Sequence, residues 1–121
     1  ERIHRTKTGA LIVATVVGGG LLAGGPPDRI TALRSFAEPI GLAFQIVDDI
    51  LDVSGDALAL GKTPGKDAKS GKATWVALHG LEASKERARE LHGQALTALH
   101  SFGSEASLLR DLASRIIHRA S

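Results

Sequence analysis

Three aspartates, Asp48, Asp49 and Asp52, stand close together in the run Phe44–Asp52. On a helix at 100° per residue, these carboxylates and Gln45 fall within an arc of roughly 100°. Apolar residues cover the rest of the circumference: Leu42, Ala43, Ile46, Val47, Ile50, Leu51 and Val53. A helix that is apolar on most sides is normally buried in protein. The pattern therefore predicts carboxylates that face an internal cavity, with Asp48 directed inward.

Carboxylates at this spacing repel one another, because helical neighbours at i,i+3 and i,i+4 are about 5–6 Å apart. Burying such unpaired charge is costly, and a hard divalent cation relieves the repulsion. Mg²⁺ is typically held by one or two carboxylates together with substrate phosphates. A solvated acidic surface face is the alternative, and the width of the apolar arc favours the metal site.

A basic segment follows the acidic run. Residues 56–71 contain three glycines and Pro64, and Gly55 directly precedes them, which predicts a loop. Four lysines lie in this loop or directly after it: Lys62, Lys66, Lys69 and Lys72. Lysines after an acidic helix could neutralise phosphate oxygens that the cation does not reach. A solvated lysine-rich loop is the alternative, and no P-loop motif can be aligned here.

Lys7 and Thr8 place a cation and a hydroxyl at the start of an uncharged run that ends at Gly25. Together they could contribute to a phosphate site. A solvated lysine beside a threonine N-cap explains the pair equally well on local grounds.

The elements that must position these groups are helical. A helix is predicted from about Arg29 to Val53, with a kink or a break at Pro39. A short helix is expected at 74–78, ended by Gly80, and two further helices carry apolar stripes: Leu81, Ala88, Leu91, Ala95, Leu99 and Phe102, then Leu108 or Leu109 with Leu112 and Ile116. Because no strand pattern is present in the sequence, the predicted fold class is all-α.

Composition narrows the function classes. The 121 residues suffice for one modest domain, and a net charge of +2 gives no support for a nucleic-acid partner. The absence of Cys excludes disulfides and thiolate catalysis, and the five His residues do not have metal-ligand spacing. A cytoplasmic protein is expected, and a start at Glu1 indicates a piece of a longer chain.

The uncharged run 8–25 also admits two other interpretations. A basic head before an apolar run resembles a membrane anchor, but 18 residues with six glycines are marginal for spanning a bilayer. Gly18, Gly20 and Ala23 match a dinucleotide-binding turn, but Pro26 and Pro27 prevent the long helix that this turn must open.

Four blocks in this order, 7–12, 41–52, 60–62 and 71–75, resemble the C-terminal part of the trans-isoprenyl diphosphate synthases, of the bacterial farnesyl or geranyl diphosphate synthase type in the polyprenyl synthetase family. The resemblance implies an all-helical bundle around a deep cavity. It also implies a cytoplasmic homodimer in which Mg²⁺ and two aspartate-rich helices bind an allylic diphosphate, which isopentenyl diphosphate elongates.

The resemblance carries roles onto individual residues. Asp48 is similar to the Mg²⁺ ligand of the second motif, with Asp49 and Asp52 on or near the hydration shell of the ion. The side chains that would contact the allylic diphosphate are those of Lys7, Lys62 and Lys72. Thr8 and Gln45 would line that pocket and assist proton removal.

The first aspartate-rich motif and the basic residues that hold isopentenyl diphosphate have no counterpart in the sequence. Residues 1–121 are therefore expected to be the C-terminal portion of one domain, inactive alone, with about half of an active site. A non-catalytic subunit of a heteromeric synthase is the second hypothesis, and a small membrane-anchored protein is the third.

Overall fold

A computed structural model describes residues 2–58 and 75–119, with side chains for 7–53 and 75–119. Within these ranges every element is helical and no strand occurs, which confirms the all-α prediction. The elements are α1 (Arg2–Leu22), α2 (Pro27–Leu58), α4 (Trp75–His79), α5 (Leu81–Ala98), the 3₁₀ helix η1 (His100–Ala106) and α6 (Ser107–His118).

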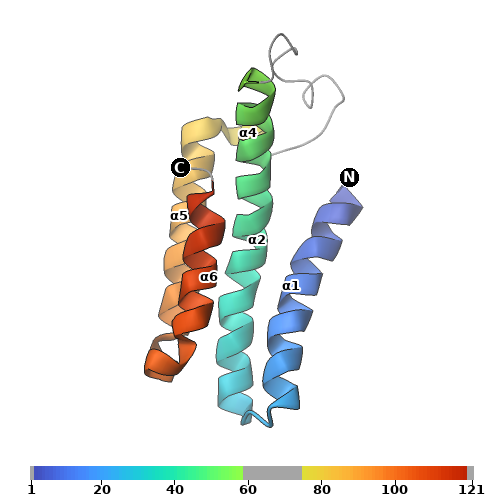
Figure 1. Cartoon of the computed structure of the whole chain (residues 1–121). Helices are drawn as coiled ribbons and strands as arrows, with labels where there is room; N and C mark the ends of the chain where they lie inside the picture. The colour runs from blue at the N-terminus through green and yellow to red at the C-terminus, as the bar shows by residue number, and fades with distance from the viewer. Residues whose placement is uncertain (1, 59–74, 120–121) are drawn as a thin grey trace.

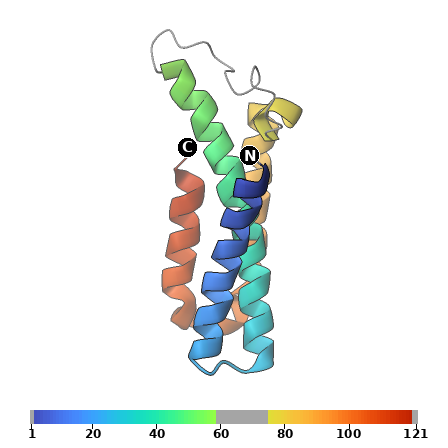
Figure 2. The same cartoon turned by 90° about the vertical axis from the view of Figure 1, so that its right-hand side faces the viewer.

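Helix α2 is the central element of the bundle. Helix α1 lies along one side of it, and α5 and α6 lie along the other (Figure 1). The view turned by 90° shows α1 in front of α2 (Figure 2). Because α2 contacts every other α-helix, its side chains determine how the bundle is held together.

Two apolar clusters follow one another along α2. Near the α1–α2 turn, Phe36, Ala37 and Ile40 pack with the second half of α5, with η1 and with Ala113 of α6. Further along α2, a second cluster joins α2 to the first half of α5 and the end of α6; its buried members are Ala43, Ile46, Val47, Ile50, Ala88, Leu91 and Ile117.

Helix α2 is longer than expected. It begins at Pro27 rather than Arg29 and continues to Leu58, so the loop expected from residue 56 does not include 56–58. Pro39 lies inside this one helix, which excludes two separate helices. Gly55 is also inside, since a single glycine costs a helix only about 1 kcal/mol.

The turn after α1 explains the glycines there. Gly24 has φ 76°, and Gly25 N donates to Gly20 O at 2.9 Å, an arrangement that ends a helix. A Cβ on Gly20 would lie 2.5 Å from Leu33 Cδ1, so α2 packs closely at this position. Across residues 2–58 and 75–119, no helix combines the length and the apolar character needed to cross a membrane.

Helix α6 is rotated relative to the expected apolar stripe. Leu108 and Leu112 are exposed, whereas Ala113 and Ile117 are buried and Leu109 and Ile116 pack at the edge of the core. The stripe i, i+4, i+7, i+8 that starts at Leu109 therefore faces α2. Of the two candidates for the apolar stripe, Leu109 is the one that faces the core. The prediction that Leu112 belongs to this stripe was wrong.

Candidate functional site

The backbones of α1 and α2 touch at two glycines. A Cβ on Gly41 would lie 3.2 Å from Gly9 Cα and 3.3 Å from Gly9 O. A Cβ on Gly9 would in turn lie 3.0 Å from Gln45 Nε2, so the amide of Gln45 rests against this crossing. A pocket of about 350 Å³ opens beside it, lined by Gly9, Ala10, Val13, Glu38, Gly41, Leu42 and Gln45. The contact between these glycines therefore places the first turns of α1 beside the part of α2 that begins with Gln45.

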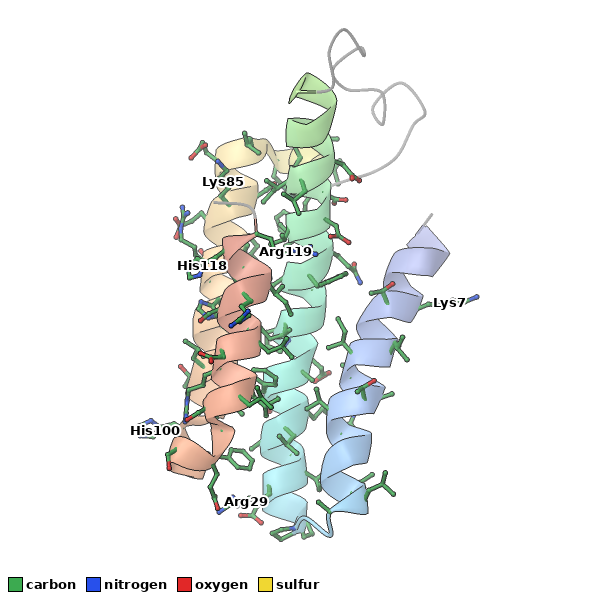
Figure 3. All side chains as sticks on the ribbon, viewed as in Figure 1. Lys7, Arg29, Lys85, His100, His118 and Arg119 are labelled. Carbon is green, nitrogen blue, oxygen red and sulfur yellow. The ribbon has the colours of Figure 1, made fainter. Side chains whose placement is uncertain are left out.

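Thr8 and Lys7 differ in how they meet this crossing. Thr8 is half-buried and directly precedes Gly9. Lys7 is exposed, and its side chain extends away from α2 (Figure 3), because α1 diverges from α2 toward its N-terminus. Since α1 begins at Arg2, Thr8 lies inside the helix and is not its N-cap.

Asp48 lies on the open side of α2, with 48% of its side chain exposed. Its Oδ1 accepts a hydrogen bond from Arg119 Nη2 at 2.6 Å. The guanidinium of Arg119 also stands 5.0 Å from the centre of the Phe44 ring, which is within cation–π range. Arg119 carries no local sequence signal for this role, because 71 residues separate it from Asp48.

Asp49 is the buried aspartate, only 3% exposed. Its Oδ2 accepts a hydrogen bond from the backbone N–H of Trp75 at 3.2 Å. The expectation that Asp48, rather than Asp49, is directed inward was wrong. Trp75 is the first residue of α4, where backbone N–H groups have no partner within the helix, so the returning chain supplies the donor that a buried carboxylate needs.

Asp52 is exposed and stands one turn beyond Asp48 on the same side of α2. The isoleucines Ile46 and Ile50 are buried in the core on the other side. In the part of the chain that the structure describes, no three carboxylate or imidazole groups come together as a metal site. The internal cavity expected around these aspartates stays a prediction. Asp48 and Asp52 remain as a pair of carboxylates, and Asp49 is directed elsewhere.

Two expected site residues, Lys62 and Lys72, lie outside the described residues. Lys72 is three residues before Trp75 in the sequence, and Trp75 is held at Asp49.

Comparison with known proteins identifies the family. The model of the family described as polyprenyl synthetase matches residues 1–107. The chain is 49% identical to farnesyl diphosphate synthase of Escherichia coli, over 98% of this chain and 41% of that protein. It is 46% identical to a dimethylallyltranstransferase of Fischerella ambigua, over 97% of this chain and 34% of the relative.

A solved structure agrees with these sequence matches. The decaprenyl diphosphate synthase of Rhodobacter capsulatus superimposes with a TM-score of 0.78 at 29% identity, over 97% of this chain and 48% of the other. The chain thus spans less than half the length of each of these relatives. With the family model covering most of its residues, the chain belongs to the polyprenyl synthetase family.

Proposed function

We propose that the protein carrying this chain is a prenyltransferase that condenses an allylic diphosphate with isopentenyl diphosphate. The family and the printed names of the relatives support this reaction class. The proposal concerns the whole protein, because the chain corresponds to 41% of the Escherichia coli relative. We further propose that it works as a cytoplasmic homodimer.

The observation that carries the proposal is the contact between Gly9 and Gly41. It brings Thr8 to the level of Gln45, and Asp48 and Asp52 follow on the next turns of the same side of α2. The hydroxyl of Thr8 on α1 is then followed by an amide and two carboxylates along one side of α2. This order suits a diphosphate group that is held by polar donors at one end and by a cation at the other.

Asp48 and Asp52 would hold Mg²⁺ in this proposal. Two carboxylates match the one or two that Mg²⁺ takes from protein when substrate phosphates complete its shell. In the structure Arg119 Nη2 occupies Asp48 Oδ1, so Mg²⁺ would bind the other carboxylate oxygen of Asp48 or displace this guanidinium. Asp49 is left out of the proposed ligand set, since its Oδ2 is committed to Trp75. When bound, Mg²⁺ supplies positive charge that stabilises the departing diphosphate.

The side chains of the chain would share the remaining work. The ammonium groups of Lys7, Lys62 and Lys72 would donate to diphosphate oxygens, which gain charge as the allylic C–O bond breaks. The alkene of isopentenyl diphosphate would then form the new C–C bond to the allylic cation, and the proton lost from the adjacent carbon would pass to an oxygen of the released diphosphate. Thr8 and Gln45 would orient the diphosphate oxygens during this loss of the proton.

The test is condensation of isopentenyl diphosphate with dimethylallyl or geranyl diphosphate by the full-length protein in the presence of Mg²⁺. Lys62→Ala should lower kcat/KM for the allylic substrate by roughly 10²-fold, the effect of losing one charge-stabilising donor. Lys66→Ala and Lys69→Ala are the controls in the same segment and should stay near wild type, because solvated lysines contribute little.

Two results would count against the proposal. Equal losses at Lys62, Lys66 and Lys69 would indicate a diffuse basic patch and remove the assigned role of Lys62. No condensation with either allylic substrate would contradict the activity itself and favour a non-catalytic subunit.

A further inference from the structure

A second pocket is lined by residues of α2, α5 and α6 and includes neither Asp48 nor Asp52. It has a volume of about 370 Å³ and is formed where α2, α5 and α6 meet. Its apolar floor is made by Val47, Ile50, Ala88 and Ile117, which belong to the second core cluster. This volume is at the small end of the range of ligand pockets, about 300–1,000 Å³.

The rest of the lining consists of four basic side chains, Lys85, Arg89, His92 and His118, and no carboxylate contributes to it. Lys85 and His118 both lie on the side of the molecule away from α1 (Figure 3). The three groups from α5 and the one from α6 therefore surround an apolar floor with nitrogen donors. Such a lining matches a ligand with one anionic end and one hydrocarbon end.

Lys85 and Arg89 are not strongly engaged elsewhere. Lys85 Nζ is 3.9 Å from Glu82 and Arg89 Nη2 is 2.9 Å from Glu86, each three residues earlier on α5. Both glutamates are largely exposed, and exposed pairs of this kind contribute about 0–1 kcal/mol. An anion in the pocket can therefore recruit both cations at little cost.

The two imidazoles lie close together at the α5–α6 side of the pocket. The ring centres of His92 and His118 are 6.4 Å apart, and His92 Nε2 is 3.4 Å from Ser114 Oγ. Burial, and then the charge of His118, lower the pKa of His92 from its ordinary value. Lys85 and Arg89 also face this position from α5, and α2 contributes only Val47 and Ile50. An anion in the pocket would favour the protonated form of His92.

We propose that this pocket is a binding site for a small amphiphilic phosphate, distinct from the reaction site and independent of the proposed activity. The phosphate would contact Lys85, Arg89 and the imidazoles, and a short hydrocarbon chain would cover Val47, Ile50, Ala88 and Ile117. Inorganic phosphate would leave the apolar floor uncovered, and a neutral alcohol would leave the cations without a partner. Both should therefore bind more weakly than the molecule that combines them.

The experiment is calorimetric titration of the full-length protein with octyl phosphate below its micelle concentration, beside inorganic phosphate and octanol. Octyl phosphate should bind roughly tenfold or more tightly than either part. The double variant K85Q/R89Q should weaken its binding by roughly tenfold or more, because it removes two charge-assisted contacts. Arg87→Gln is the matched control, since Arg87 pairs with Glu90 at the same i,i+3 spacing on α5 but does not line the pocket.

A second variant tests the apolar floor. Ala88→Leu should reduce the preference for octyl phosphate over inorganic phosphate, and thermal unfolding of the same sample establishes that the variant folds. Affinities that are equal for octyl phosphate and inorganic phosphate would overturn the proposal. So would an equal loss in Arg87→Gln, unchanged binding in K85Q/R89Q, or binding only to phosphatidic acid vesicles. The rate of condensation measured without octyl phosphate should be the same in K85Q/R89Q as in the wild type. The test of the pocket is therefore separate from the test of the proposed reaction.

Discussion

The two sides of α2 hold the bundle together in different ways. Toward α1, the contact is between backbones at Gly9 and Gly41, and polar side chains follow it along the helix. Toward α5 and α6, the contact is between large apolar side chains such as Ile46 and Ile50, which are fully buried. One side brings backbone and polar groups close together, and the other removes apolar area from water.

This difference separates two kinds of residue on one helix. Side chains on the α5–α6 side contribute to stability because they lose contact with water on folding. Asp48 and Asp52 are half-exposed or exposed, so their contribution to stability is small. Mutations on the two sides should therefore affect different measurements.

The largest effect is expected at Asp48. Asp48→Ala in the full-length protein should lower kcat/KM by roughly 10²–10⁴-fold, because a lost metal ligand removes several kcal/mol of transition-state stabilisation. Its thermal unfolding should change little. Asp49→Ala is the neighbouring control: it should reduce stability by about 1–3 kcal/mol through the lost Trp75 contact and reduce the rate less. A larger loss of rate in Asp49→Ala than in Asp48→Ala would contradict this assignment.

Ile46→Ala should have the opposite profile. Removing this fully buried side chain leaves a cavity in the second core cluster and should lower the free energy of unfolding by about 2–5 kcal/mol. Urea unfolding measures the loss. Leu108→Ala is the control on α6, where the exposed side chain should contribute within about 0.5 kcal/mol. Similar losses of stability in Ile46→Ala and Leu108→Ala would indicate that Leu108 belongs to the apolar face of α6.

Gly41→Ala tests the backbone contact. Its new Cβ would meet two backbone atoms of Gly9, so α1 must move away and stability should fall by about 1–3 kcal/mol. Gly93→Ala is the matched control on α5, because no atom lies within 4 Å of its Cβ position; it should stabilise by about 0.5–1 kcal/mol. Stabilisation in both variants would show that α1 and α2 do not touch at these glycines.

The smallest effect concerns His92 on the α5–α6 side. Its pKa is lowered below 6.5 by burial and by His118, so the unfolded chain takes up a proton before the folded protein does. The contribution to stability is therefore complete above about pH 6.5 and is lost as pH falls below it. His92→Gln should flatten the fall in the urea midpoint between about pH 7 and pH 5.

The sequence was sufficient for the helices and for the family, because both depend on local pattern. The 3.6-residue periodicity gives the helical class, and the motif blocks are read directly from neighbouring residues. Helix α2 exceeds its predicted length because Pro39 and Gly55 cost less than its packing provides. The sequence therefore predicts the ends of a helix less well than its presence.

The orientation of the aspartates could not be read in the same way. The helical wheel gives the angle between Asp48 and Asp49. It does not give which of the two faces the core, because that depends on what packs around α2. The deciding partners are Trp75 and Arg119, which are 26 and 71 residues away in the sequence. A buried carboxylate follows its donor, and periodicity holds no information about a donor on another helix.

The Trp75–Asp49 contact also has a practical use. Trp75 is the only tryptophan of the chain, and there is no tyrosine. Its ring centre is 4.3 Å from that of His79. Fluorescence from this chain therefore originates at one position, at the return of the polypeptide to α2. Steady-state emission and its quenching can follow that position without any attached dye.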